Sequence, residues 1–495
     1  MSSCTFPIAS TAALPPRGAG LPLNQGFFVE SLYSFDMTVT ELKKQSSVPG
    51  ALQRSGIYYG WIAMAAGTVG VVMSVPGQTM GVSVYTDHLL QGLSISRIQL
   101  SIAYMLGTLA SALLLPMVGR LLDHLGARLL GVVASIGLAL SLVFLAGSPS
   151  LLSRITAQTR WDPEWVGLAL AFVGFLGIRH FGQGQLTMTS RTMIGRWFER
   201  RRGFVFGLSG LFVAFGFGIA PLVLNHLIDR FHWRTSLLII AGALVLMAGF
   251  VWLTFRNSPE ECGLEIDGGL AKKLELSPVL EIPSLTAPQA ARTSAFWIFN
   301  FGLLGQALIS TAITFHMGRL AQLNGMSTAK AFSVFLPVAA LSTTCDLLGG
   351  LLSDRIPLKY LLATMQLGMC LGLLGMQAYG TTSGFALTAV GLGVSNGLYS
   401  LLSGAAWPRL FGRRHLGAIA GLSMGWIVAG SAVGPFLFSL GLAAKGNFHA
   451  VLYLSLLLPA IIFFASFFAN APLRVAIRAD NSNTPQITLA SRSHV

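Results

Sequence analysis

Two ionisable side chains lie deep within long apolar stretches of this chain of 495 residues, and their types suggest a chemistry. Arg179 is separated from Arg196 by roughly 25 Å of helix, and Asp346 precedes Asp354 by roughly 12 Å. A charge within hydrocarbon is costly, so such residues usually face a wet cavity or a charged partner. A guanidinium holds a carboxylate through two parallel hydrogen bonds, and a buried carboxyl can take up and release a proton. We therefore predict that Arg179 binds an organic anion, with a permanent ion pair to Asp346 as the alternative, and that Asp346 exchanges a proton.

Uncharged polar side chains in the apolar stretches could complete such a site. Pro76-Gly77 interrupts the first stretch, and a break in a helix frees backbone groups to meet a ligand. The further substrate-binding candidates are Gln78, Thr79, Gln183, Asn396 and Tyr399. Hydrogen bonding between helices explains each of them at least as well. The second coupling candidate, His316, lies near the far end of its stretch, which favours an outer gate over a central ligand.

Motifs for catalysis and for metal binding are not found in the sequence. It holds no P-loop, no H-E-x-x-H motif and no cluster of cysteine and histidine with metal-ligand spacing. Gly421–Gly425 fits the G-x-S-x-G pattern of serine hydrolases, but that motif needs a strand-to-helix turn and this segment is apolar and helical. We therefore predict no catalytic residue, no cofactor and no metal ion.

Composition excludes most classes of protein. Apolar residues make up 53% of the chain and charged residues only 10%, whereas soluble proteins carry about 25% charged residues. A soluble enzyme, a disordered protein and a disulfide scaffold are excluded, and a polytopic membrane protein is indicated. The net charge of +14 is then explained by basic loops held against an anionic lipid bilayer, so no nucleic-acid partner is predicted.

The apolar segments predict an all-α membrane protein with twelve transmembrane helices in two six-helix bundles, since each span needs about 20 apolar residues. The predicted helices cover 57–87, 96–118, 128–148, 164–192, 203–227, 234–255, 294–319, 328–352, 358–379, 384–408, 415–441 and 448–470. They form an N-terminal bundle at 56–255 and a C-terminal bundle at 294–470. The predicted remainder is a disordered cytoplasmic tail at 1–55, a cytoplasmic linker at 256–293 and a cytoplasmic tail at 471–495.

The two halves repeat the same loop and predict a gate. Gly119–Arg128 follows the second helix and Gly350–Lys359 follows the eighth, with Gly, Leu, Asp and a final cation in register. The gating candidates are Gly119, Asp123, Gly126, Arg128, Asp354 and Arg355. Asp123 is expected to meet cations or a helix N-terminus of the other bundle when one side is closed. The alternative is a simple turn rich in basic residues.

These loops resemble a known family. Gly119–Arg128 is similar to the signature loop of the major facilitator superfamily, with His124 and Ala127 in place of two arginines. Segments similar to the oxalate/formate antiporter-like and monocarboxylate transporter-like branch are Tyr59–Trp61, Trp197-Phe198, Pro259–Leu264 and Trp407-Pro408. The resemblance implies two pseudo-symmetric bundles that rock around a midplane cavity, and an arginine in the fourth helix followed by a Gly-Gln-Gly segment, as at Arg179.

Together these observations predict a secondary transporter, not an enzyme. It would move a small organic anion, a mono- or dicarboxylate, by proton symport or by anion exchange. Efflux of amphiphilic drug-like compounds and a transport-dead membrane sensor are the alternatives. An excess of basic residues after helices 2, 4, 8 and 10 predicts that both termini are cytoplasmic, in a plasma or inner membrane.

Overall fold

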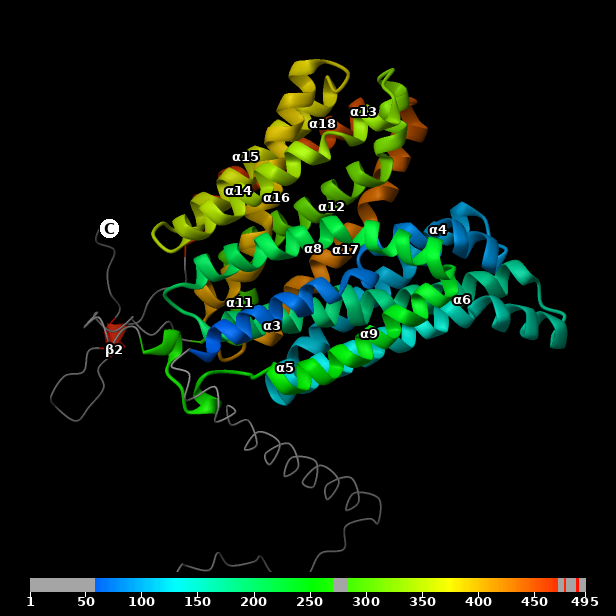
Figure 1. The fold of residues 1–495 in the computed structure, drawn as a ribbon. Coiled ribbons are helices and arrows are strands. Elements are labelled where there is room, and N and C mark those ends of the chain that lie inside the picture. The colour runs from blue at the N-terminus through cyan, green and yellow to red at the C-terminus, as the bar shows by residue number, and fades with distance from the viewer. Residues whose placement is uncertain (1–57, 270–283, 471–475, 478–486, 489–495) are drawn as a thin grey trace, which may run out of the picture. The chain divides into compact units, whose positions relative to one another are not determined.

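The computed structural model describes residues 58–269, 284–470, 476–477 and 487–488 (Figure 1). Of the two units of the chain, Met1–Ser47 and Val48–Val495, the described residues belong to the second. The predicted tail at 1–55, part of the predicted linker and most of the predicted tail at 471–495 lie outside the described residues.

Helices make up nearly all of the described chain. Those of the first half are α3 (Tyr59–Met73), η1 (Val75–Gly77, a 3₁₀ turn), α4 (Thr79–Leu93), α5 (Arg97–Gln158), α6 (Pro163–Ile178), η2 (Arg179–Leu186, a π-helix), α7 (Thr187–Trp197), α8 (Arg202–Phe231) and α9 (Trp233–Thr254). Those of the second half are α12 (Ser294–Leu323), α13 (Thr328–Phe332), α14 (Phe335–Ser353), α15 (Leu358–Gln377), α16 (Thr382–Phe411), α17 (Leu416–Lys445) and α18 (His449–Ser466). Short elements complete the described chain: η3 (Glu260–Cys262), η4 (Ile266–Gly268), α11 (Ala287–Ala291), and the antiparallel strands β1 (Ala476–Ile477) and β2 (Ile487–Thr488).

The described residues hold eleven helical segments long and apolar enough to cross a membrane, and one of them, Ile98–Gln158, has 61 residues, enough for two spans of about 20 residues each. That segment lies in α5, whose 62 residues are divided by Gly126 with φ of 83°. Glycine adopts this left-handed conformation without the steric penalty that other residues meet. The prediction of twelve transmembrane helices is therefore confirmed.

The largest error among the predicted helix boundaries is at Pro149. The sequence suggests that the third helix ends at residue 148, but the helix continues through Pro149 to Gln158. A proline within a helix removes the hydrogen bond to the carbonyl four residues earlier. Here the Ser148 hydroxyl donates to the Leu145 carbonyl at 2.8 Å, so this carbonyl keeps a partner.

The halves touch through glycines, and the contact is repeated. A Cβ atom on Gly119 of α5 would lie 2.3 Å from the Gly417 carbonyl oxygen of α17. A Cβ atom on Gly203 of α8 would lie 2.3 Å from the Gly350 carbonyl oxygen of α14. Small residues allow such close approach of helix backbones in a membrane. Two equivalent helix pairs, α5 with α17 and α8 with α14, therefore join the halves.

Candidate substrate cavity and gate

A cavity of about 290 Å³ lies between helices of both halves. Its wall is formed by α3, α4, η2, α7 and α8 from the first half and by α12, α16 and α17 from the second. All five uncharged candidates from the sequence line it: Gln78, Thr79, Gln183, Asn396 and Tyr399. The structure therefore brings together residues that are more than 300 positions apart in the chain. That they bind a substrate stays a prediction.

Arg191 is the one charged residue that lines this cavity in the described part of the chain. It lies on α7, and its Nη1 atom donates to the Ser400 carbonyl at 3.0 Å and to the Ser403 hydroxyl at 2.6 Å. Both partners belong to α16, so the guanidinium bridges the two halves at the cavity wall. Sequence reasoning grouped Arg191 with the basic residues at the membrane surface. Its position more than one helical turn inward from Arg196 is the signal that could have identified it.

Hydrogen bonds orient the polar wall of the cavity. The Asn396 side-chain oxygen accepts from Gln306 Nε2 at 2.5 Å and from Ser310 Oγ at 3.1 Å. Opposite them, Gln78 Nε2 donates to Ser74 Oγ at 3.0 Å and to Thr187 Oγ1 at 3.3 Å. The amide groups of Asn396 and Gln78 are thus held by neighbours in their own half, whereas the side-chain oxygen of Gln183 has no hydrogen-bond partner among the described residues.

The rest of the lining is apolar or weakly polar. Its large apolar side chains are Met80, Met188, Phe217, Trp407 and Met424. The site therefore offers one fixed cation, several uncharged hydrogen-bonding groups and an apolar wall. Such a combination suits a small amphipathic anion.

Asp346 lies behind the cavity wall, next to Arg191. Only 3% of its surface is exposed, and its Oδ1 atom has no hydrogen-bond partner among the described residues. The Ser400 hydroxyl bonds to its carboxyl group, and the charge of Arg191 acts on it. It packs against Gly210 of α8, at the contact between α8 and α14. Asp346 is therefore a buried carboxyl group on which the charge of Arg191 acts, and its part in coupling stays a prediction.

His316 does not line the cavity. It lies late in α12, where its Nε2 atom is 2.9 Å from the Pro435 carbonyl oxygen and 3.3 Å from Ser439 Oγ of α17. Its ring stacks on Phe438. These contacts join α12 to α17 within the second half, away from the cavity. A role of His316 in coupling stays a prediction.

The structure corrects the predicted position of Arg179. Its side chain is 1% exposed and does not line the cavity. Nε donates to Thr108 Oγ1 at 3.2 Å, Nη1 donates to the Gly77 carbonyl at 3.0 Å, and the guanidinium lies 5.0 Å from the Tyr104 ring. The alternative, an ion pair with Asp346, is not formed either, because Arg191 is the cation beside that carboxylate.

The π-helix explains this error. Residues four apart share one face of an α-helix, so in a regular helix the two substrate-binding candidates Arg179 and Gln183 would face the cavity together. In η2 the hydrogen bonds run from residue i to i+5, which changes the rotation per residue. Gln183 faces the cavity, whereas Arg179 points into the first half.

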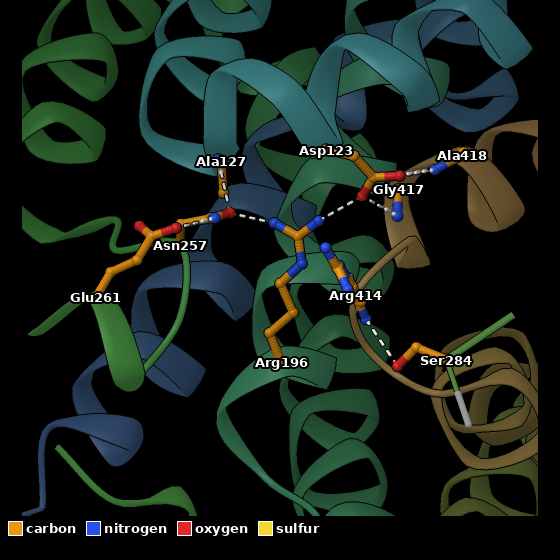
Figure 2. Close-up of polar contacts among 9 residues, drawn as sticks. All are labelled: Asp123, Ala127, Arg196, Asn257, Glu261, Ser284, Arg414, Gly417 and Ala418. Atoms are coloured by element: carbon orange, nitrogen blue, oxygen red, sulfur yellow. Dashed lines mark hydrogen bonds and ion pairs between the residues drawn. The ribbon is translucent and has the colours of Figure 1, made fainter. Parts of the chain in front are cut away.

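The first carboxylate contact of the predicted gate is centred on Asp123 (Figure 2). Its carboxylate accepts hydrogen bonds from the backbone N–H groups of Gly417 and Ala418, both at 2.7 Å. These groups form the start of α17, where the helix dipole favours an anion. Arg196 adds an ion pair to Oδ1 at 2.6 Å. The contact with a helix N-terminus of the other half is as the sequence predicts, and its role in gating stays a prediction.

The second carboxylate contact of the predicted gate is centred on Asp354. Its carboxylate accepts from the backbone N–H groups of Gly203 at 2.8 Å and Phe204 at 3.2 Å, at the start of α8. Burial raises the pKa of this carboxyl above its usual value, although the two hydrogen bonds act in the opposite direction. The internal repeat is thus reproduced as two carboxylate contacts, each with the first turn of a helix in the opposite half.

The remaining gating candidates play different parts. Gly119 permits the close α5–α17 contact, and Gly126 forms the break in α5. Arg128 donates to the Trp252 carbonyl at 2.7 Å and stacks on the Trp252 ring at 4.0 Å, so it joins α5 to α9 within the first half. Arg355 is exposed. The structure therefore does not place Arg128 or Arg355 in the contact between halves.

Sequence reasoning missed a third component of the gate, the segment that follows α9. Arg196 bonds to the side-chain oxygen of Asn257, and Asn257 donates to Glu261 at 2.7 Å (Figure 2). Arg413, just before α17, donates to the Arg196 carbonyl at 2.6 Å and pairs with Glu260 at 2.8 Å. This segment therefore holds Arg196 from one side while Asp123 holds it from the other.

A family model described as Major Facilitator Superfamily matches residues 62–345, more than half of the chain. The chain belongs to the Major Facilitator Superfamily. The predicted resemblance is confirmed, and a similarity to mouse (Mus musculus) monocarboxylate transporter 11 supports its monocarboxylate transporter-like branch. That similarity is 29% identity over 362 residues, covering 68% of this chain and 70% of the mouse protein.

Solved structures of this superfamily share the fold. The E. coli fucose:proton symporter FucP has a TM-score of 0.56 at 16% identity, and covers 83% of this chain and 98% of its own. The proton:xylose symporter XylE has a TM-score of 0.58 at 16% identity, and covers 83% of this chain and 95% of its own. The chain is therefore an integral multi-pass membrane protein with a transporter fold.

Proposed function

We propose that this superfamily member is a secondary active transporter of small organic anions, and of monocarboxylates in particular. The observation that carries the proposal is Arg191, which among the described residues is the single charged residue in the wall of a cavity shared by both halves. Its guanidinium fork fits a carboxylate, and it stays charged. The uncharged residues Gln78, Thr79, Gln183, Asn396 and Tyr399 would then bind the remaining polar groups of the substrate.

A substrate with one negative charge matches this cavity better than a dicarboxylate. One lining cation compensates one carboxylate, and Asp346 behind it would repel a second. An uncompensated charge in a desolvated site costs several kcal/mol. The similarity to a protein named monocarboxylate transporter 11 agrees with this preference.

Arg191 and Asp346 offer a route to proton coupling. When a substrate carboxylate binds the Arg191 guanidinium, the positive charge of Arg191 no longer compensates Asp346. A buried carboxylate without a counter-charge is costly and binds a proton instead. Substrate and proton would then move together, as in symport. In anion exchange Asp346 would stay unprotonated, and a second anion would replace the first at Arg191.

Substrate binding could also loosen the closed side of the molecule. Arg191 bridges α7 to α16, and its partners Ser400 and Ser403 lie in the other half. A carboxylate that competes for the guanidinium would weaken this bridge while Asp123 and Asp354 still hold the gate. We propose that this gate faces the cytoplasm, because the basic residues of the chain are in excess on its side.

The test is uptake into proteoliposomes with matched variants. The wild-type protein should take up short monocarboxylates faster than dicarboxylates, and an inward proton gradient should drive accumulation. Arg191→Gln should lose most uptake, whereas Arg120→Gln, at an exposed arginine of α5, should not. The Asp346→Asn variant should still transport monocarboxylates, but an inward proton gradient should no longer drive their accumulation. Full uptake by Arg191→Gln would contradict the proposal.

The apolar wall favours a second candidate, the efflux of amphiphilic compounds. Met80, Met188, Phe217 and Met424 form an adaptable surface that suits varied apolar ligands. The same liposomes separate the two functions. A hydrophobic cation that competes with monocarboxylate uptake, or that is moved by the Arg191→Gln variant, would favour efflux.

A further inference from the structure

Two irregular helical segments pack against each other beside the cavity. The η1 turn interrupts the first transmembrane helix, and the η2 π-helix interrupts the fourth. A Cβ atom on Gly77 would lie 2.2 Å from the Ile178 carbonyl oxygen and 2.8 Å from the Gly182 Cα atom. The two interruptions therefore fit together closely enough to require glycine at this point.

Arg179 satisfies a backbone group that the first interruption frees. Its Nη1 atom donates to the Gly77 carbonyl at 3.0 Å. Within a bilayer an unsatisfied carbonyl costs several kcal/mol, so a break in a helix persists only where a neighbour replaces the lost hydrogen bond. Here that neighbour is a charged side chain from the opposite interruption.

Side chains of α5 hold the arginine in place. Thr108 Oγ1 accepts from Nε at 3.2 Å, and the Tyr104 ring lies 5.0 Å from the guanidinium. The Tyr104 hydroxyl also lies 2.9 Å from Thr79 Oγ1. The arginine is thus connected to the last residue of η1, Gly77, through its own Nη1, and to the first residue of α4, Thr79, through Tyr104.

The residues directly after the break line the cavity. Gln78 and Thr79 belong to its wall, and they stand one and two positions after Gly77. We propose that Arg179 is a positioning residue: it fixes the break in the first helix so that Gln78 and Thr79 face the substrate cavity. This inference deepens the proposed function and rests on it for the meaning of the cavity, but the geometry exists without any substrate.

The proposal is tested on the full chain in lipid nanodiscs without substrate, by amide hydrogen exchange. In Arg179→Met, residues 75–82 should exchange about tenfold faster or more than in the wild type, because a hydrogen bond to a charged group is lost. Amides of α15, which lies in the other half, should be unchanged. Arg179→Lys keeps a cation for the Gly77 carbonyl and should recover most of the protection. Unchanged exchange at 75–82 in Arg179→Met would overturn the proposal.

Two milder variants keep the test decisive if Arg179→Met does not fold. Thr108→Val removes the acceptor for Nε, and Tyr104→Phe keeps the ring but removes the hydroxyl that meets Thr79. Both should raise exchange at 75–82 by a smaller factor, and neither changes a residue of the cavity wall. If exchange rises while monocarboxylates are not transported by the wild type, the proposed function fails and the positioning role stands. Unchanged exchange in both variants would contradict that role.

Discussion

The predicted gate contains two carboxylate contacts, at Asp123 and at Asp354, that share the same hydrogen bonds but differ in their ion pairing. Asp123 and Asp354 each accept two backbone hydrogen bonds from the first turn of a helix in the other half. Only Asp123 has an ion pair among the described contacts, to Arg196 at 2.6 Å. The internal repeat has preserved the anion at the helix N-terminus and has varied the cation that stabilises it.

This difference changes what each carboxylate contributes. The Asp123 and Arg196 side chains are 11% and 5% exposed, so each depends on the other for compensation. The charges of Arg409 and Arg202 lower the pKa of Asp354, but burial, which raises it, is the largest effect. We therefore expect Asp123 to contribute most of the electrostatic stabilisation of the closed gate, and Asp354 to contribute mainly through packing.

The largest effect is expected for Asp123→Asn. It removes the ion pair of the buried Arg196 and leaves only the weaker influence of Glu261 on that cation. Loss of one partner costs about 3–5 kcal/mol in comparable buried pairs. The closed gate should open, with loss of turnover and a smaller loss of substrate binding, since binding depends on the cavity. Spin labels on α5 and α17 can report this opening by their distance distribution. Equal distributions in Asp123→Asn and the wild type would contradict the assigned role.

An intermediate effect is expected where a methyl group is forced into a contact between halves. Gly119→Ala places a Cβ atom 2.3 Å from the Gly417 carbonyl oxygen, and overpacking of this kind costs about 1–3 kcal/mol. The control is Gly147→Ala, also in α5, where a Cβ atom would meet no other atom of the described residues within 4 Å. Labelling of single cysteines on the gate side should increase for Gly119→Ala alone. Similar labelling of the two variants would show that the α5–α17 contact does not hold the gate.

The smallest effect is expected for Asp354→Asn. Because burial raises the pKa of Asp354, the closed gate stabilises its charged form less well than water does, so replacing the carboxylate by an amide should remove little stabilisation. By linkage, the wild-type α8–α14 contact gains stability as the pH falls through the raised pKa and loses it as the pH rises. Asp354→Asn should remove this dependence and change closure at neutral pH by less than about 1 kcal/mol. Spin labels on α8 and α14 at pH 5 and 7.5 provide the measurement. An opening as large as that of Asp123→Asn would make the two halves equivalent.

The sequence was sufficient for the number of spans, the repeat and the partner of Asp123. Hydropathy reports burial in the bilayer for each segment separately, and the loop Gly119–Arg128 carries its own turn and its own anion. These features are properties of short stretches of chain, so they can be recognised before the helices are packed. The five uncharged cavity residues were also found, because polar side chains are rare within apolar spans.

The tertiary structure decided which arginine reaches the cavity. Arg179 and Arg191 lie in one continuous span, and both are arginines within apolar surroundings. The π-helix η2 changes the direction in which the Arg179 side chain points. Because η2 packs against η1, the Gly77 carbonyl lies where Arg179 can donate a hydrogen bond to it. Arg191 reaches the cavity because α16 supplies two oxygen atoms more than 200 residues away. The direction of a side chain depends on helical register and on distant backbone, and neither is a property of the residue itself.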